Sequence, residues 1–282
     1  MAVCEVCFRH CDISEGKRGA CLARECRDGH VIPVNYGCIT SLALDPIEKK
    51  PLRRFFPGSK ILSAGSYGCN LFCPFCQNHD ISRSDGTGFE DVIDPEALTD
   101  IAVRYKDRGN IGIAYTYNEP LTGYEFVRDT AKLVRDAGLK NVLVSNGTAA
   151  IPVLEELLPY IDAMNIDIKS MSEQTYRDFL GGDLFTVREF IKRSVSDCHV
   201  ELTMLIVPGM NDTDGEMREL TEWISGLKDK DGNLIGPGIP LHISRFFPRY
   251  KVADRPPTDI GRILALAEIA KEKLRYVYTG NI

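Results

Sequence analysis

Three cysteines in a span of eight residues place the strongest constraint on this chain. Cys69, Cys73 and Cys76 follow the pattern C-x3-C-x2-C, directly after an apolar run over residues 61–68 that ends in glycine. That run predicts a buried strand, so the cysteines should lie on the loop at its carboxyl end. Three thiolates on one short loop can hold three corners of a cubane iron–sulfur cluster. The missing fourth ligand leaves one iron open to an outside ligand, as a catalytic metal site requires.

A zinc site is the alternative interpretation of this motif. Zinc prefers two spaced pairs of ligands or a histidine nearby, and His79 could supply such a ligand. We favour the iron–sulfur site because a purely structural or electron-transfer site would normally be closed by a full set of four ligands.

Strand and helix patterns alternate along the rest of the chain. Further strands are expected at 112–117, 141–145, 163–168, 200–207, 240–247 and 276–279. Helices are expected at 95–108, 121–137, 151–160, 172–180, 185–196, 213–227 and 259–274. About six β–α repeats predict an α/β fold with parallel strands and crossover helices. In either an open sheet or a barrel, the working residues should sit at the carboxyl ends of the strands.

Polar residues follow three of these strands at their carboxyl ends. They are Asn118 and Glu119, Ser145 and Asn146, and Asp167 and Lys169. Glu119 can accept hydrogen bonds from a cationic ammonium group, and Asn118 adds an amide. The two-residue repeat of a strand places Asp167 and Lys169 on the same side, so both should face the same space.

Each of these groups also has a structural interpretation. Glu119 suits the first turn of the helix at 121–137, where the helix dipole favours an anion. Ser145 and Asn146 suit a turn before the helix at 151–160. Asp167 and Lys169 could form an ion pair without any ligand. The strand-end positions favour a functional role for Glu119 and for the Asp167–Lys169 pair, while both interpretations stay open for Ser145 and Asn146.

A second group of cysteines lies near the N-terminus. Cys4, Cys7, Cys11 and Cys21 follow the pattern C-x2-C-x3-C-x9-C, and Cys26 is a spare candidate. Four thiolates can close around zinc or around a second [4Fe–4S] cluster. Thiols that bind nothing are a less favoured alternative, because they would be easily oxidised. We expect residues 1–56 to form a small cysteine-rich lobe that binds metal, and residues 57–282 to form the main domain.

Composition and charge argue against several classes of protein. The formal net charge of −6 over 282 residues argues against general binding to nucleic acids or anionic membranes. No stretch has the length and apolar character of a membrane span, and the first twenty residues are too polar for a signal peptide. We therefore expect a cytoplasmic protein, whose ten cysteines serve as metal ligands rather than as disulfides.

The motifs resemble those of the radical S-adenosylmethionine (SAM) superfamily. GCNLFCPFCQNHDIS, YNEP, SNG, DIK and VPG occur in an order similar to that of glycyl-radical activating enzymes of the pyruvate formate-lyase type. DPIEKKPLRRFFPGS and HISRFFPRYK resemble more specifically the radical SAM component of the AmmeMemoRadiSam group. The resemblance implies a partial (β/α)6 barrel, a [4Fe–4S] cluster on Cys69, Cys73 and Cys76, and SAM bound to its open iron. It further implies an oxidoreductase that cleaves SAM reductively, with an electron from a partner such as flavodoxin or ferredoxin.

The resemblance also implies roles for individual residues. It assigns cofactor contacts to Phe75 against adenine, Glu119 and Asn118 at the SAM amino group, and Ser145 and Asn146 at the ribose or carboxylate. It places Asp167 and Lys169 beside SAM and its products, as candidate catalytic residues.

Three functions remain open from the sequence. The first is a 5′-deoxyadenosyl radical that abstracts hydrogen from a glycine of a protein partner. The second is the same radical chemistry on an unknown small molecule or protein of the AmmeMemoRadiSam system. The third is a non-catalytic iron–sulfur or zinc binding module. The N-terminal cysteines, absent from the simplest activating enzymes, leave the substrate in question.

Overall fold

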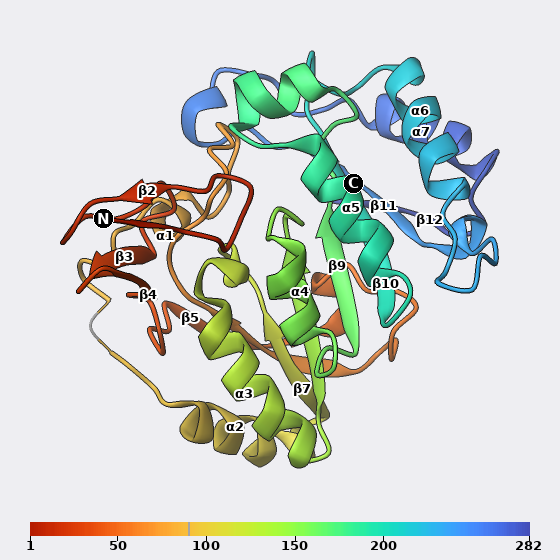
Figure 1. The fold of residues 1–282 in the computed structure, drawn as a ribbon. Coiled ribbons are helices and arrows are strands. Elements are labelled where there is room, and N and C mark those ends of the chain that lie inside the picture. The colour runs from red at the N-terminus through yellow and green to blue at the C-terminus, as the bar shows by residue number, and fades with distance from the viewer. Residues whose placement is uncertain (90) are drawn as a thin grey trace.

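One eight-stranded sheet forms the centre of the computed structural model, which describes residues 1–89 and 91–282 (Figure 1). The strands lie in the order β12-β11-β10-β9-β8-β7-β6-β5. Their bounds are β5 (Ser41–Pro46), β6 (Lys60–Gly65), β7 (Asn110–Tyr115), β8 (Lys140–Ser145), β9 (Ala163–Asp167), β10 (His199–Ile206), β11 (Leu241–Arg245) and β12 (Val277–Gly280). From β6 to β12 every pair is parallel, whereas β5 runs antiparallel to β6. The expected α/β fold, a partial parallel barrel, is confirmed.

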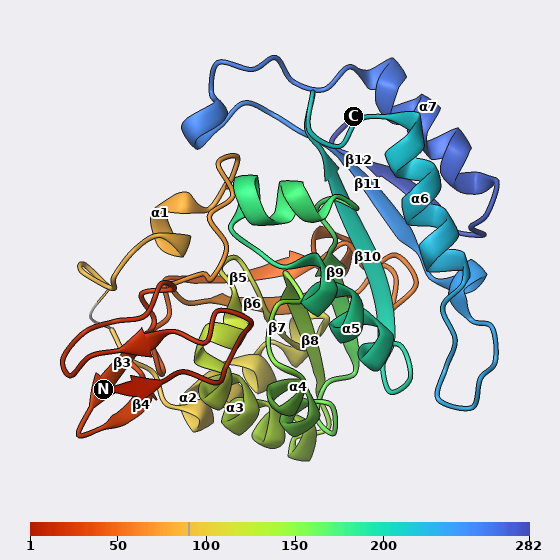
Figure 2. The same ribbon diagram turned by 45° about the horizontal axis from the view of Figure 1, so that its top comes forward.

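Helices connect the parallel strands and cover the outer face of the sheet (Figures 1 and 2). They are α2 (Pro95–Arg104), α3 (Tyr124–Asp136), α4 (Ile151–Leu157), α5 (Leu184–Ser194), α6 (Asp214–Ser225) and α7 (Ile260–Lys271). Asp94, Asp183, Thr213 and Asp259 cap four of them through side-chain oxygens that accept a backbone N–H. These caps fix where the helices begin, close to the positions that the sequence predicts.

The shorter helical elements correct two expectations. The helix expected at 121–137 begins as a 3-10 turn, η3 (Pro120–Gly123), and becomes α-helical only in α3. The segment expected as a helix at 172–180 is instead a π-helix, η4 (Thr175–Leu180). The remaining short elements are α1 (His79–Ser82), η1 (Ile47–Lys49), η2 (Lys106–Arg108), η5 (Gly236–Gly238) and η6 (Tyr250–Val252).

The two faces of the sheet pack against different partners. Ile113, Leu143 and Ile166 belong to the large core formed with the helices. The alternate positions on the opposite face, including Val142 and Ala163, belong to a smaller cluster with the buried residues Ile47 and Leu52. Residues 47–59, which follow β5, therefore close one end of the inner face, and we call them the floor segment.

A buried carboxylate anchors the floor segment. Glu201 on β10 accepts backbone hydrogen bonds from Arg53 at 3.0 Å and from Arg54 at 2.7 Å. His199 and His242 contact the same carboxylate at 2.9 and 2.6 Å. These bonds lower the pKa of Glu201 to about 2, although burial acts in the opposite direction. Glu201 thus ties the floor to the centre of the sheet, and His242 serves this network.

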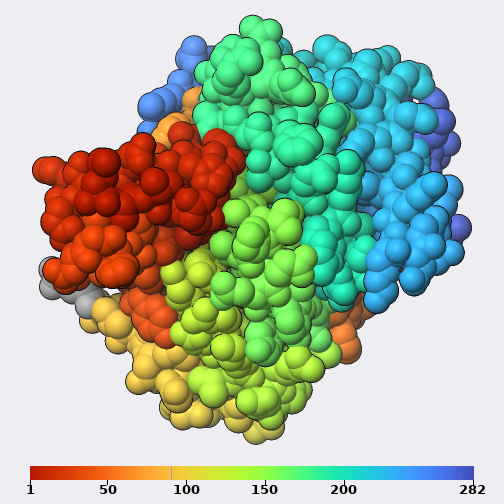
Figure 3. Space-filling view, viewed as in Figure 1, coloured from red at the N-terminus to blue at the C-terminus, as the bar shows by residue number. Residues whose placement is uncertain are grey.

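The first part of the chain forms a small lobe of two hairpins. β1 (Ala2–Val3) pairs with β2 (Asp12–Ile13), and β3 (Arg24–Arg27) pairs with β4 (His30–Pro33). The lobe adjoins the middle of the chain in the space-filling view (Figure 3), and the Ala150 N–H donates to the Val6 carbonyl at 2.9 Å. β5, which lies within the expected lobe of residues 1–56, is part of the main sheet. The expected domain boundary between residues 56 and 57 stays a prediction. No helix in the described part of the chain has the length and apolar character needed to span a membrane.

Candidate functional site

A cavity of about 340 Å³ opens where the parallel strands end. It gathers every candidate from the strand ends and the cysteine loop, namely Cys69, Cys73, Cys76, Phe75, Asn118, Glu119, Ser145, Asn146, Asp167 and Lys169. The topology explains this convergence, because the loops after parallel strands all emerge at one edge of the sheet. We call this cavity the strand-end pocket.

The cysteine loop follows β6 by way of Gly68, a position that only glycine can occupy without strain. Gly68 has a φ of +90°, and an added Cβ would lie 2.7 Å from both the Ala23 side chain and the Cys21 carbonyl. Its N–H donates to the Ile81 carbonyl at 3.1 Å, which ties the start of the loop to α1. The close approach of the lobe at this point fixes how Cys69 enters the pocket.

The three thiols of the loop lie among polar groups. The Leu71 N–H points to Cys69 Sγ at 3.5 Å, and Asn146 Nδ2 lies 3.7 Å from the same sulfur. Cys76 Sγ lies 3.8 Å from the Ser82 hydroxyl. Burial raises the pKa of Cys69, and it raises the pKa of Cys73 to about 11 although Lys169 acts in the opposite direction. A metal ion must therefore displace protons from these thiols when it binds.

The donor set fits a cubane cluster better than a single ion. Among the described residues, no group of three His, Cys, Asp or Glu side chains is arranged to hold one metal ion. His79, the candidate fourth ligand for zinc, does not line the pocket; its ring stacks on Tyr250 at 4.4 Å between centroids. A cluster spreads its ligands over separate iron atoms, so three cysteines on one loop can hold it and leave the fourth iron open.

Glu119 is the most deeply placed carboxylate of the pocket, with 3% of its surface exposed. Its Oε1 accepts from the Leu121 N–H at 3.1 Å and from the Ser145 hydroxyl at 2.9 Å, and its Oε2 accepts from the Asn146 N–H at 2.7 Å. Burial raises its pKa to about 7, against the effect of these bonds and of Lys169. Glu119 therefore caps η3, as its structural interpretation predicted, and it also lines the pocket.

The amide and hydroxyl candidates hold the walls of the pocket in place. Asn118 donates to the carbonyls of Tyr67 at 3.0 Å and Gly68 at 3.1 Å, and its Oδ1 accepts from the Ser66 N–H at 3.1 Å. It thereby fixes the backbone that leads into the cysteine loop. Asn146 Nδ2 donates to Asn70 Oδ1 at 3.0 Å and so connects the end of β8 to the same loop.

Asp167 and Lys169 face the pocket together, as strand alternation predicted. Lys169 Nζ lies 3.0 Å from Asp167 Oδ2, and the Lys169 N–H donates to the Tyr176 hydroxyl oxygen at 3.0 Å. Burial lowers the pKa of Lys169, but Asp167 and Cys73 outweigh it and the net shift is upward. Lys169 is therefore a cation held beside Cys73. Phe75 is buried in the same wall, 6.3 Å from Phe179 between ring centroids.

Sequence reasoning missed a buried ion pair on the floor side of the pocket. Lys50 is 3% exposed, and its Nζ lies 3.0 Å from Asp45 Oδ2. The Tyr117 and Ser63 hydroxyls donate to the same oxygen at 2.8 and 2.9 Å, and Lys50 Nζ lies 4.4 Å from the centroid of the Tyr117 ring. Lys50 lines the pocket next to Pro51. The DPIEKK segment was the available signal, but the sequence does not show that its second lysine turns inward.

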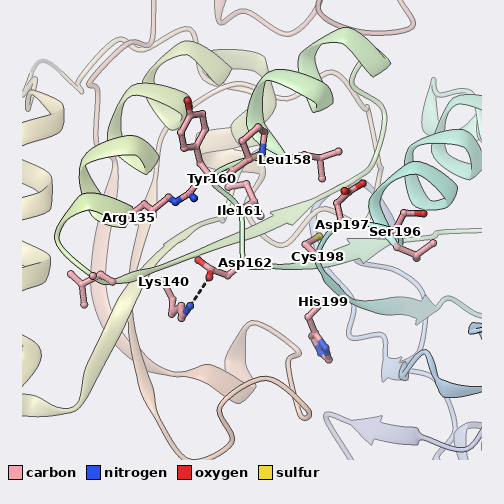
Figure 4. Close-up of a pocket in the computed structure, with 14 residues that line it drawn as sticks. Arg135, Lys140, Leu158, Tyr160, Ile161, Asp162, Ser196, Asp197, Cys198 and His199 are labelled. Atoms are coloured by element: carbon pink, nitrogen blue, oxygen red, sulfur yellow. Dashed lines mark hydrogen bonds and ion pairs between the residues drawn. The ribbon is translucent and has the colours of Figure 1, made fainter. Parts of the chain in front are cut away.

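A second cavity of about 660 Å³ lies at the opposite end of the sheet (Figure 4). It is lined where β8, β9 and β10 begin, by residues that include Lys140, Asp162 and Cys198. Lys140 and Asp162 pair with each other at 2.7 Å (Figure 4). This cavity holds none of the candidate residues, and the amino ends of the strands are not where such folds place their chemistry.

The N-terminal candidates occupy a site of their own. Cys4, Cys7, Cys11 and Cys21 line one small cavity in the lobe, and Asn70 of the cysteine loop forms part of its wall. Cys26 lies outside this cavity, with its Sγ 3.5 Å from a carboxylate oxygen of Glu15. The structure therefore groups the four cysteines whose spacing suggested a metal site.

Comparison with known proteins agrees with the geometry of the strand-end pocket. The family model of the radical SAM superfamily matches residues 64–224. An uncharacterized protein of Methanocaldococcus jannaschii is 40% identical over 283 residues, which cover 99% of this chain and 81% of that protein. The pyruvate formate-lyase-activating enzyme of Clostridium pasteurianum is 26% identical over 215 residues, 73% of this chain and 88% of that protein.

Solved structures show the same fold. A radical SAM methyltransferase from Sphaerobacter thermophilus superposes with a TM-score of 0.55 at 14% identity, over 80% of this chain and 67% of that one. The matched family region contains the cysteine loop and the strand ends that form the pocket. A [4Fe–4S] cluster and SAM are the cofactors that the family implies for these residues. The protein belongs to the radical SAM superfamily and is related to the pyruvate formate-lyase-activating enzymes.

Proposed function

We propose that this protein is an activating enzyme that abstracts hydrogen from a glycine of a protein partner. The observation that carries the proposal is the meeting, in one pocket, of three cysteines on an open loop with Glu119 and the Asp167–Lys169 pair. The relationship to a pyruvate formate-lyase-activating enzyme supports this type of substrate. When bound, the cluster and SAM supply a 5′-deoxyadenosyl radical, after one electron arrives from a reductant such as flavodoxin or ferredoxin.

The residues of the pocket supply the binding and orientation. Cys69, Cys73 and Cys76 would hold the cluster, and because they supply only three thiolates, one iron would stay available to SAM. Glu119 would accept a hydrogen bond from the SAM ammonium, because a buried carboxylate forms a strong, charge-assisted bond with such a partner. Lys169 stands where it can balance a carboxylate of SAM or of its product methionine, and Asp167 keeps it charged and in place.

The remaining cofactor contacts follow from the walls. Phe75 offers an apolar surface to adenine, and Asn118, Ser145 and Asn146 hold the cluster loop and Glu119 at fixed positions. A radical must be shielded from water, so such rigid walls are what the chemistry requires. The floor segment shields the pocket from the other end of the sheet.

A second candidate is the same chemistry on a small molecule or another protein of the AmmeMemoRadiSam system. The segments 45–59 and 242–251 favour it, and the first of them places Lys50 in the pocket. A non-catalytic binding module is disfavoured, because such a module has no need for a buried Glu119 and a Lys169 aimed at the same cavity.

Product analysis tests the proposal. Anaerobically reconstituted, reduced protein with SAM should form 5′-deoxyadenosine and methionine slowly, and faster when the substrate is present. A glycine-centred EPR doublet on a candidate protein partner would establish the activating role. Acceleration by a small molecule without that doublet would favour the second candidate. Absence of 5′-deoxyadenosine from protein with an intact, reduced cluster would refute both.

A further inference from the structure

Four thiols of the lobe face one enclosed space that the proposed reaction does not use. Cys4, Cys7, Cys11 and Cys21 line it, and all but Cys11 are buried. Burial raises the pKa of Cys4 and Cys7, and raises that of Cys21 to about 11, with neighbouring cysteine charges adding to the effect in each case. The four thiols share this one cavity although they come from two separate parts of the chain, residues 4–11 and residue 21.

Two arginines bring positive charge to this space. Arg24 is 4% exposed and lines the cavity, and it forms a bidentate pair with Glu125 at 2.8 and 2.9 Å through its terminal nitrogens. Its Nε is buried and has no hydrogen-bond partner among the described residues. A buried N–H without an acceptor costs about 1–3 kcal/mol. Cys4 and Cys21 line the same cavity as Arg24, so a thiolate sulfur there would give this N–H an acceptor.

Arg9 supplies the second charge and connects the lobe to the cysteine loop. It lines the cavity, and its Nε donates to the Asn70 carbonyl at 2.7 Å. Four thiolates carry four negative charges, and a zinc ion or an oxidised [4Fe–4S]²⁺ core cancels only two of them. Arg9 and Arg24 lie beside the charge that would remain, and because Glu125 already neutralises one of these two cations, they offset part of it.

Asn70 belongs to both sites. It follows Cys69 in the sequence and lines the lobe cavity together with Cys7. Its other contacts lead to the strand-end pocket, through Asn146 at 3.0 Å and Thr148 at 2.8 Å. Asn70 thus contacts the lobe cavity on one side and is directly bonded to Cys69, the first cysteine of the catalytic loop, on the other.

We propose that Cys4, Cys7, Cys11 and Cys21 hold a second [4Fe–4S] cluster, closed by four cysteines. Thiolates around one zinc ion at about 2.3 Å lie about 3.8 Å apart, and no group in the described residues is arranged in this way. The same is true of the three cysteines of the catalytic loop, for which the family implies a cluster. With four ligands the lobe cluster would have no open iron for SAM, and it would lie beside Asn70 of the catalytic loop.

Removing the catalytic cluster isolates the proposed one. The full chain carrying Cys69→Ser, Cys73→Ser and Cys76→Ser is reconstituted anaerobically with iron and sulfide, and iron, sulfide and zinc are then counted. We expect about four irons and four sulfides per chain, with the EPR signal of a reduced [4Fe–4S] cluster that does not change with SAM. One zinc per chain, or no bound metal, would overturn the proposal. This measurement leaves the lobe itself unaltered, so it does not depend on whether lobe variants fold.

Lobe variants identify the ligands. Adding Cys4→Ser and Cys7→Ser to the triple variant should remove the remaining iron, whereas adding Cys198→Ser should not, because Cys198 lies at the opposite end of the sheet. Iron that survives the loss of Cys4 and Cys7 would overturn the assignment. With the catalytic cysteines intact, Cys4→Ser/Cys7→Ser should retain a SAM-responsive EPR signal. The two proposals can therefore fail independently.

Discussion

Replacing Glu119 by glutamine should change how stability depends on pH. Burial raises the pKa of Glu119 from 4.5 to about 7, so folding disfavours its ionised form. The sign follows from proton binding: between these two values the folded chain holds a proton that the unfolded chain releases, so stability falls as pH rises. Between about pH 5 and about pH 8, this single group removes about 2–3 kcal/mol from the free energy of unfolding.

Glutamine has nearly the same shape and does not ionise, so Glu119→Gln should lose this pH dependence. In urea unfolding of the metal-free, reduced chain, the stability of the variant relative to the wild type should rise by about 2–3 kcal/mol between about pH 5 and about pH 8. Glu173→Gln, at an exposed position, should run parallel to the wild type and serves as the control. If the stability of Glu119→Gln also ran parallel to that of the wild type across this pH range, the argument that ionised Glu119 destabilises the folded chain would be refuted.

The same variant should bind SAM less tightly. Losing one charge-assisted hydrogen bond to the SAM ammonium costs about 1.5–3 kcal/mol, which weakens binding about 10- to 150-fold near pH 8. The cluster should survive, because Glu119 is not a ligand. A variant whose stability relative to the wild type rises with pH, and which binds SAM less tightly, would show that the Glu119 carboxylate serves SAM binding and not stability. Unchanged SAM affinity would leave Glu119 with only its structural role at η3.

Further expectations concern the cluster loop and the ion pair beside it. Cys73→Ser should lose the SAM-responsive EPR signal while circular dichroism keeps its helical signal, since serine replaces a cluster ligand at the edge of the core with a side chain of similar size. Gly68→Ala should lower the free energy of unfolding by 2 kcal/mol or more, because its Cβ would meet Ala23 at a φ of +90°; an unfolding curve equal to the wild type would contradict this. Lys169→Met should cost about 1–3 kcal/mol by leaving the Asp167 charge unpaired, and Lys169→Met/Asp167→Asn should recover part of it in the same unfolding assay.

Local pattern was sufficient to predict most of the sheet. The strands from β6 to β12 are short apolar runs that end in glycine, proline or polar residues, and each lies within a few residues of its expected range. Because parallel strands end at one edge, the position of Asp167 and Lys169 in the chain already implied that they face the cysteine loop. These features follow from sequence neighbours alone.

Other features depend on contacts between distant segments and could not be predicted. β5 joins the sheet as its antiparallel edge, yet its residues offer only a mixed pattern of exposed and buried side chains. The π-helix at 175–180 carries an ordinary helical pattern, and Tyr176 inside it is buried against the backbone of Lys169. The sequence around Lys50 is typical of a surface lysine, and only the structure shows Asp45 and Tyr117 beside its ammonium group. The pairing of β5 with β6 and the contact of Tyr117 with Asp45 join segments far apart in the sequence, whereas Tyr176 lies only seven residues from Lys169.

In the strand-end pocket, the expected ligands would stabilise the ionised side chains that burial disfavours. The thiols of Cys69 and Cys73 have raised pKa values, and an iron centre stabilises the thiolate form that burial disfavours. Glu119 has a raised pKa for the same reason, and a cationic ammonium beside it restores the anion. The ionised thiolates and carboxylate, which burial disfavours in the ligand-free chain, are thus the forms that the cluster and SAM would stabilise. Binding must then stabilise the fold in return, because any ligand that prefers the folded chain raises its stability by linkage.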